Sequence, residues 1–155
     1  MAEVDFIGLP TSVPDADSYR HGAGFRSLNF NQMQFRITRH TLKFRFIAGT
    51  SRGVITEKET WFVKIWNDKN PEIYGIGECS PLNGLSIDYS SDYEYDLSDI
   101  CKKIFSVDDS IPDVSEALNK IPLYFPSIRF GIETAILDLK NGGKRKIFNC
   151  GFYDR

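Results

Sequence analysis

The feature that most constrains this chain is a change of hydrophobic period partway along it. From residue 34 to residue 79 apolar and polar side chains alternate, whereas from residue 92 to residue 140 apolar side chains recur every three or four positions. A period of two indicates half-buried strands, and a period near 3.6 indicates amphipathic helices. Strands followed by helices predict an α+β fold, a three-stranded antiparallel meander followed by three helices.

The predicted strands are residues 34–47, 54–67 and 72–79. The small, polar residues 48–53 are expected to form a loop, and residues 68–71 a turn. The apolar side chains of the first strand that are expected to share a face are Phe35, Ile37, Leu42, Phe44 and Phe46. In the second strand Trp61, Val63 and Ile65 are expected to face the opposite way from Phe62, Lys64 and Trp66. Gly75 and Gly77, inside the third strand, indicate a bulge or a close backbone approach.

The predicted helices are residues 92–105, 113–121 and 127–140. Their apolar stripes are Tyr93, Leu97, Ile100, Cys101 and Ile104 in the first, Val114, Ala117, Leu118 and Ile121 in the second, and Ile128, Ile132, Ala135, Ile136 and Leu139 in the third. Pro112 is expected near the start of the second helix, where proline is tolerated. Asn141, Gly142 and Gly143 predict the end of the third.

Composition favours an ordinary globular domain. The chain has 155 residues, 41% of them hydrophobic, and a formal net charge of −2. This near-neutral balance argues against nucleic acid or an anionic membrane as partner. No apolar run approaches the ~18 residues that a membrane span needs. Cys79, Cys101 and Cys150 form no CxxC pair, so we expect free thiols and a cytoplasmic location.

Few residues offer catalytic chemistry by themselves. His40 is expected to be structural, His21 lies in an irregular leader formed by residues 1–32, and Glu78 at the end of the third strand is more consistent with a structural than a catalytic role. The acidic residues expected mainly on a solvated helix face and first turn are Asp88, Asp92, Glu94, Asp96 and Asp99. They lack the ligand spacing of a calcium loop.

Three segments, AGTSRGVITEKETWFVKIW (48–66), GIGECSPLNGLS (75–86) and PSIRFGIETAILDL (126–139), resemble the N-terminal capping domain of the enolase superfamily. The resemblance is greatest to its o-succinylbenzoate synthase family, which acts in menaquinone biosynthesis. It implies that residues 33–143 form the capping domain and that residues 144–155 are a truncated start of the catalytic (β/α) barrel. The remaining barrel is then missing, and the chain is expected to be a fragment.

The resemblance also implies which residues would contact a small carboxylate substrate. These specificity-loop residues are Gly49, Thr50, Ser51, Arg52 and Gly53 in the first loop, and Leu82, Gly84, Leu85 and Ser86 in the second. The family reaction is a Mg²⁺-assisted dehydration of a cyclohexadiene carboxylate, with lysine bases and acidic metal ligands on the barrel. No catalytic residue, metal ligand or bound Mg²⁺ is therefore expected in this chain, which is predicted to be inactive alone.

Two other interpretations remain open. The chain could be the cap of a sibling enzyme, a dipeptide epimerase or a muconate cycloisomerase, or it could be a stand-alone binding module without catalysis. In each case a barrel-facing surface that includes Phe130 and Leu137 is expected to be exposed and to favour self-association.

Overall fold

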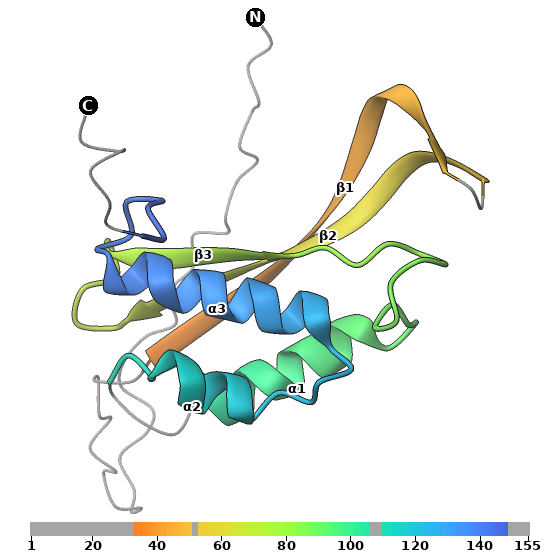
Figure 1. Cartoon of the computed structure of the whole chain (residues 1–155). Helices are drawn as coiled ribbons and strands as arrows, with labels where there is room; N and C mark the ends of the chain where they lie inside the picture. Colours follow the sequence, from red (N-terminus) through yellow and green to blue (C-terminus); the bar gives the residue numbers. More distant parts are fainter. Residues whose placement is uncertain (1–32, 51–52, 106–109, 149–155) are drawn as a thin grey trace, which may run out of the picture.

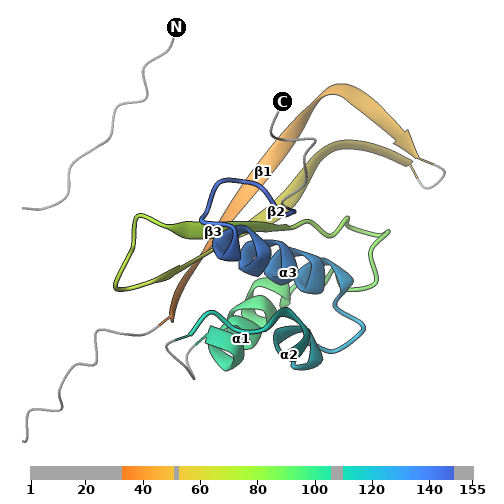
Figure 2. The same cartoon turned by 60° about the vertical axis from the view of Figure 1, so that its left-hand side comes forward.

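The computed structural model describes residues 33–50, 53–105 and 110–148, and the predictions for residues 1–32 and for Cys150 lie outside this part. Its strands are β1 (Met33–Thr50), β2 (Gly53–Asn67) and β3 (Tyr74–Cys79), and its helices are α1 (Tyr93–Phe105), α2 (Val114–Asn119) and α3 (Pro126–Lys140). The strands form one antiparallel sheet in the order β1-β2-β3. The helices lie on one face of this sheet, and part of the β1–β2 hairpin extends beyond them (Figures 1 and 2). The predicted meander and helix order are confirmed.

The hairpin is longer than the hydrophobic pattern predicted. Thr50 pairs with Gly53 and Gly49 pairs with Val54, so most of the predicted loop at 48–53 is strand. Small, polar residues still carry backbone donors and acceptors, and these can continue a ladder after the apolar alternation has ended. At the other end of β2 the turn extends to residue 73, and β3 begins at Tyr74 rather than at residue 72.

The predicted apolar face of β1 is partly wrong. Pairing runs without a shift from Met33 opposite Asn67 to Lys43 opposite Glu57, so side chains alternate faces throughout. Phe35 and Ile37 therefore lie on one face and Leu42 on the other. The only register shift in this pair falls between Lys43 and Ala48, after Leu42. Phe44 is 41% exposed, and the side chain of Phe46 is not described.

Close contact between β3 and α3 explains the glycines of the third strand. A Cβ atom on Gly77 would lie 1.7 Å from the carbonyl oxygen of Gly131, and one on Gly75 would lie 2.0 Å from that of Ala135. The β2–β3 register is unbroken, so of the two predicted explanations the close approach is confirmed and the bulge is not. Absence of side chains here lets the helix backbone rest directly on the strand.

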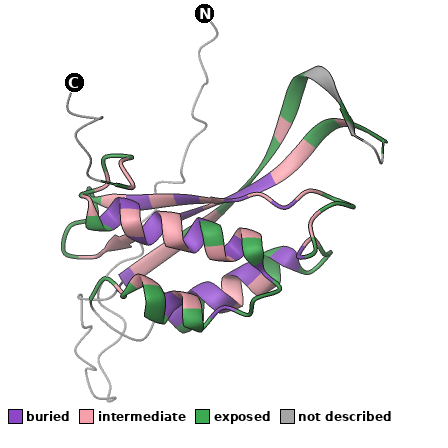
Figure 3. Ribbon diagram, viewed as in Figure 1, coloured by how far each residue is buried: buried purple, intermediate pink, exposed green. Residues whose placement is uncertain are grey.

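The core lies between the sheet and the helices (Figure 3). The predicted stripe residues are all buried in α1 and α3, whereas in the second helical segment Ala117 and Ile121 are buried and Val114 and Leu118 are partly buried. Trp61, Val63 and Ile65 of β2 are also buried, as predicted. In α2 the Asp113 carboxylate caps the helix by accepting from two backbone amides, so Pro112 precedes the cap instead of lying in the first turn.

The segment after α3 folds back onto the sheet. Gly142 and Gly143 have positive φ values of 79° and 67°, which confirms the predicted helix end. The buried carboxylate of Asp138 then accepts from the backbone N–H of Ile76 at 3.0 Å and of Arg145 at 2.7 Å, and it also pairs with the Arg145 guanidinium. These contacts join β3, α3 and the following turn.

Two further findings concern membranes and cysteines. Within the described ranges no helix is both long enough and apolar enough to cross a bilayer. Cys79 and Cys101 are buried free thiols. Burial raises the pKa of the Cys79 thiol to about 12 and raises that of Cys101 as well.

Candidate functional site

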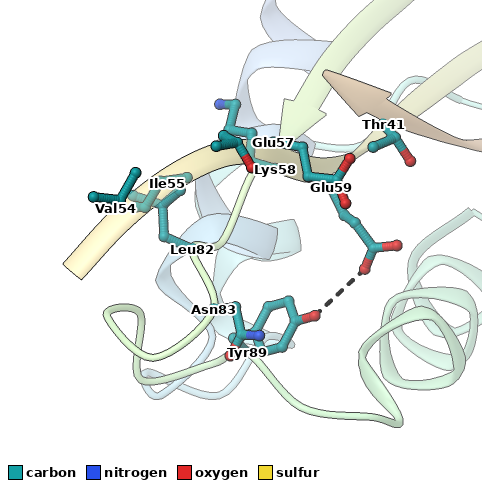
Figure 4. Close-up of a pocket in the computed structure, with 10 residues that line it drawn as sticks. Thr41, Val54, Ile55, Glu57, Lys58, Glu59, Leu82, Asn83 and Tyr89 are labelled. Atoms are coloured by element: carbon teal, nitrogen blue, oxygen red, sulfur yellow. Dashed lines mark hydrogen bonds between the residues drawn. The ribbon is translucent and has the colours of Figure 1, made fainter. Parts of the chain in front are cut away.

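A cavity of about 500 Å³ separates the outer part of the hairpin from the loop that follows β3 (Figure 4). Its lining residues are Thr41, Val54, Ile55, Thr56, Glu57, Lys58, Glu59, Leu82, Asn83 and Tyr89. Segments that are about 25 residues apart in the sequence thus meet around one space. Its walls combine apolar side chains with hydroxyl, amide, ammonium and carboxylate groups, which is typical of a small-molecule site.

The loop that forms one wall is held closed by its own hydrogen bonds. The backbone N–H groups of Leu85 and Ser86 donate to the carbonyl of Leu82 at 3.0 and 2.9 Å, and the Leu82 N–H donates to Ser86 Oγ at 2.9 Å. Gly84, at φ 72°, occupies the left-handed region that other residues rarely adopt. The loop is therefore a defined turn, on which Ile87 is 78% exposed.

Lys58 of β2 fixes the start of this loop. Its ammonium donates to Ser80 Oγ at 2.6 Å and lies 3.7 Å from the Glu78 carboxylate. Glu78 also accepts from the Thr60 hydroxyl at 2.8 Å, in agreement with the structural role predicted for it. Together with Ser127 and Phe130, the residues Lys58, Glu78 and Ser80 line a second, smaller cavity of about 360 Å³.

Asp88 fixes the end of the loop to α3. Its Oδ2 atom accepts from the backbone N–H of Ser127 at 2.8 Å and from the Ser127 hydroxyl at 2.5 Å. The local N-cap residue of α3, Phe125, supplies no side-chain bond, so a carboxylate from another segment caps this helix. Asp88 is only 4% exposed, and grouping it with solvated acids was wrong. In the sequence, the apolar Phe125 directly before Pro126 indicated that the N-cap residue of this helix has no side-chain acceptor.

An ion pair lies where the hairpin leaves the core. The Arg39 guanidinium of β1 donates to Glu59 Oε1, and this hydrogen bond and charge raise the pKa of Arg39. The Tyr89 hydroxyl donates to Glu59 Oε2 at 3.4 Å (Figure 4). Beside them the Trp61 indole N–H donates to Glu94 of α1 at 3.0 Å.

The structure brings together only part of the predicted specificity residues. Leu82 lines the cavity, and Gly84, Leu85 and Ser86 form the turn behind it. Gly49 and Gly53 are exposed strand residues at the end of the hairpin. Of Thr50 only the backbone is described, and Ser51 and Arg52 lie outside the described residues.

Sequence reasoning missed all the residues of β2 that line the cavity. The polar run Thr56 to Glu59 was a possible signal, because it interrupts the apolar alternation of an otherwise patterned strand. His40 is exposed on β1 and is not among the lining residues.

Carboxylate groups do not converge here as a metal site would require. In the part of the chain that the structure describes, no three His, Cys, Asp or Glu side chains are grouped so that they could hold a metal ion. The described residues therefore do not fit the Mg²⁺ of the resembled family, and we derive no step through that ion.

Comparison with known proteins supports the resemblance. No protein-family model matches the chain. A curated relative, o-succinylbenzoate synthase of Desulfotalea psychrophila, is 31% identical over 144 residues, which cover 77% of this chain and 38% of the relative. The chain thus spans less than half of that protein's length.

Solved structures share the fold. A mandelate racemase/muconate lactonizing protein from Herpetosiphon aurantiacus has a TM-score of 0.59 at 15% identity, covering 74% of this chain and 32% of its own. A dipeptide epimerase from Enterococcus faecalis, solved with Mg and L-Leu-L-Tyr, has a TM-score of 0.58 at 18% identity, with 70% and 31% covered. At these identities the likeness shows the fold.

Strand order, helix placement and these similarities define the fold class: the described residues have the fold of an N-terminal capping domain of the enolase superfamily. Within that superfamily, its curated relative is an o-succinylbenzoate synthase.

Proposed function

We propose that residues 33–148 act as the substrate-specificity cap of an o-succinylbenzoate synthase-like dehydratase. The observation that carries the proposal is the cavity that the hairpin and the loop after β3 line together. The 31% identity to a synthase favours this activity over the sibling epimerase and cycloisomerase activities. Mg²⁺ and the groups that move protons belong, in this proposal, to a barrel that the described residues do not include.

The lining suits a small organic carboxylate. Val54, Ile55 and Leu82 offer apolar surface to a ring, and the Asn83 amide offers two N–H donors to carboxylate oxygens. Glu57 and Glu59 also line this wall. The Lys58 ammonium is bound to Ser80 and lies near Glu78, so the Asn83 amide is the donor that we expect to contact a substrate carboxylate. In this role the cap orients the substrate and excludes water, and it carries out no bond-breaking step itself.

A chimera tests the proposal. Residues 33–148 replace the matching segment of the Desulfotalea psychrophila synthase, and formation of o-succinylbenzoate is measured with Mg²⁺ present. We expect activity in the chimera and none in the 155-residue chain alone. In the chimera, Asn83→Ala should raise KM by about 2- to 10-fold, the range for one lost hydrogen bond. Asn119→Ala, at the end of α2, is the matched control and should leave KM unchanged.

Three results would contradict the proposal. A folded chimera that forms no product would remove the synthase assignment, and epimerisation of dipeptides by the chimera would favour the sibling activity. Equal KM values for the two alanine variants would show that the cavity does not contact the substrate. Cytoplasmic location and self-association through the predicted barrel-facing surface stay predictions; of its two named residues, Phe130 is 61% exposed and Leu137 is half-buried.

A further inference from the structure

Glu59 lies where two projecting segments separate from the core. Immediately after it on β2, Thr60 and Trp61 are buried at 0% and 3% exposure. Before it, from Gly53 to Lys58, no residue of the strand is buried, and the hairpin extends away from the helices (Figure 1). The loop after β3 leaves the sheet beside this point, and the cavity opens between hairpin and loop.

The two oxygens of Glu59 bind different segments. Oε1 accepts from the Arg39 Nε–H at 2.9 Å, and Arg39 lies on β1 with its guanidinium 5.6 Å from the centroid of the Trp61 ring. Oε2 accepts from the hydroxyl of Tyr89, at the end of the loop. A single carboxylate therefore connects the edge strand of the hairpin to the opposite wall of the cavity.

We propose that Glu59 is the positioning residue of this cavity: by holding Tyr89 on one side and Arg39 on the other, it fixes the distance between hairpin and loop. That this distance selects the substrate rests on the proposed function. The connection itself does not, because it is a property of the cap alone.

The contacts of Glu59 with Arg39 and Tyr89 act locally and do not stabilise the whole domain, because the side chains that make them are partly exposed. The side chains of Arg39 and Glu59 are 53% and 27% exposed, and ion pairs at such positions contribute little to global stability. The loop depends on few apolar contacts, since Leu85 and Ile87 are exposed. Its order therefore depends more on polar anchors than the order of the helices does.

Hydrogen exchange of the 155-residue chain, read by mass spectrometry, tests the inference. Tyr89→Phe removes only the hydroxyl, and we expect amides of residues 82–89 to exchange about 2- to 10-fold faster, the range for one lost hydrogen bond. Peptides from α3 and from β2 after Thr60 should keep their rates. Tyr95→Phe is the matched control, because that side chain is 73% exposed on α1, and it should change nothing.

Combining substitutions identifies Glu59 as the shared partner. Glu59→Ala should also speed exchange in residues 82–89, and adding Tyr89→Phe should speed it no further, since each substitution removes the contact between Glu59 and Tyr89. Unchanged exchange of residues 82–89 in Tyr89→Phe overturns the inference, and so does an equal increase throughout α3 and β3. In the chimera, Tyr89→Phe should raise KM and leave kcat unchanged. If exchange responds and KM does not, the connection stands and the proposed function fails.

Discussion

The two halves of β2 belong to one continuous strand but are held in place by different forces. From Thr60 to Ile65 every residue is buried or half-buried, and the alternate side chains Trp61, Val63 and Ile65 lie under the helices. From Gly53 to Glu59 the strand has backbone pairing with β1 and a few polar contacts, and Val54 is 64% exposed. The inner half supplies stability. The outer half is largely exposed, and in the proposed function it presents side chains to a ligand.

The contact between β3 and α3, here called the seam, is the most closely packed part of the core. A substitution that disrupts the seam should therefore have the largest effect on the stability of the domain. Gly77→Ala would place a methyl group 1.7 Å from the Gly131 carbonyl oxygen, so strand and helix must separate. We expect a loss of about 3 kcal/mol in the free energy of unfolding, or failure to fold. Urea denaturation followed by circular dichroism measures it.

Gly49→Ala is the control in the outer half, because nothing lies within 4 Å of the Cβ position there. It should change stability by less than about 0.5 kcal/mol. Similar losses for the two variants would mean that the hairpin is as constrained as the seam, and the comparison would fail.

A pair of valines on β2 sharpens the comparison within one strand. Val63 is completely buried and Val54 is 64% exposed. Val63→Ala should cost about 1–2 kcal/mol, through lost apolar burial and the cavity left behind, and Val54→Ala less than about 0.5 kcal/mol. Thermal unfolding of both variants at one pH gives the two values. A larger loss at Val54 would reverse the assignment of the two halves.

The same division separates what the sequence could predict from what it could not. Periodicity located Trp61, Val63 and Ile65 and the stripes of α1 and α3, because burial on one face imposes a repeat on the residue types. It placed Leu42 on the wrong face and did not predict that Phe44 is 41% exposed, because in the exposed hairpin an apolar side chain no longer reports which face is covered.

The site depended on contacts between distant segments, which no local pattern encodes. Asp88 caps α3 from 39 residues away, and Tyr89 reaches Glu59 across 30 residues. Each of these residues looks like an ordinary surface residue in the sequence. The loop residues Leu82 to Ser86 were found through family resemblance, whereas the β2 wall of the cavity appeared only when the strands were paired in space.

Cys79 lies at the boundary between the buried core and the exposed loop that follows β3. It is the last residue of β3 and is fully buried beside Gly131. Burial raises its pKa from an ordinary value of 9.0 to about 12. In the unfolded chain the thiol ionises near pH 9, and in the folded chain it remains protonated. The folded state therefore binds more protons above pH 9, and its stability falls as the pH rises towards 12.

Between pH 8 and pH 10 this thiol should cost the folded state about 1 kcal/mol, measured by urea denaturation across that range. Cys79→Ala removes the titrating group, so its stability should depend less steeply on pH, whatever its absolute value. The native thiol should also resist iodoacetamide at pH 9 and react after unfolding, because the thiolate is the nucleophile. Rapid labelling of Cys79 in the native chain would place this end of β3 with the exposed loop instead of the core.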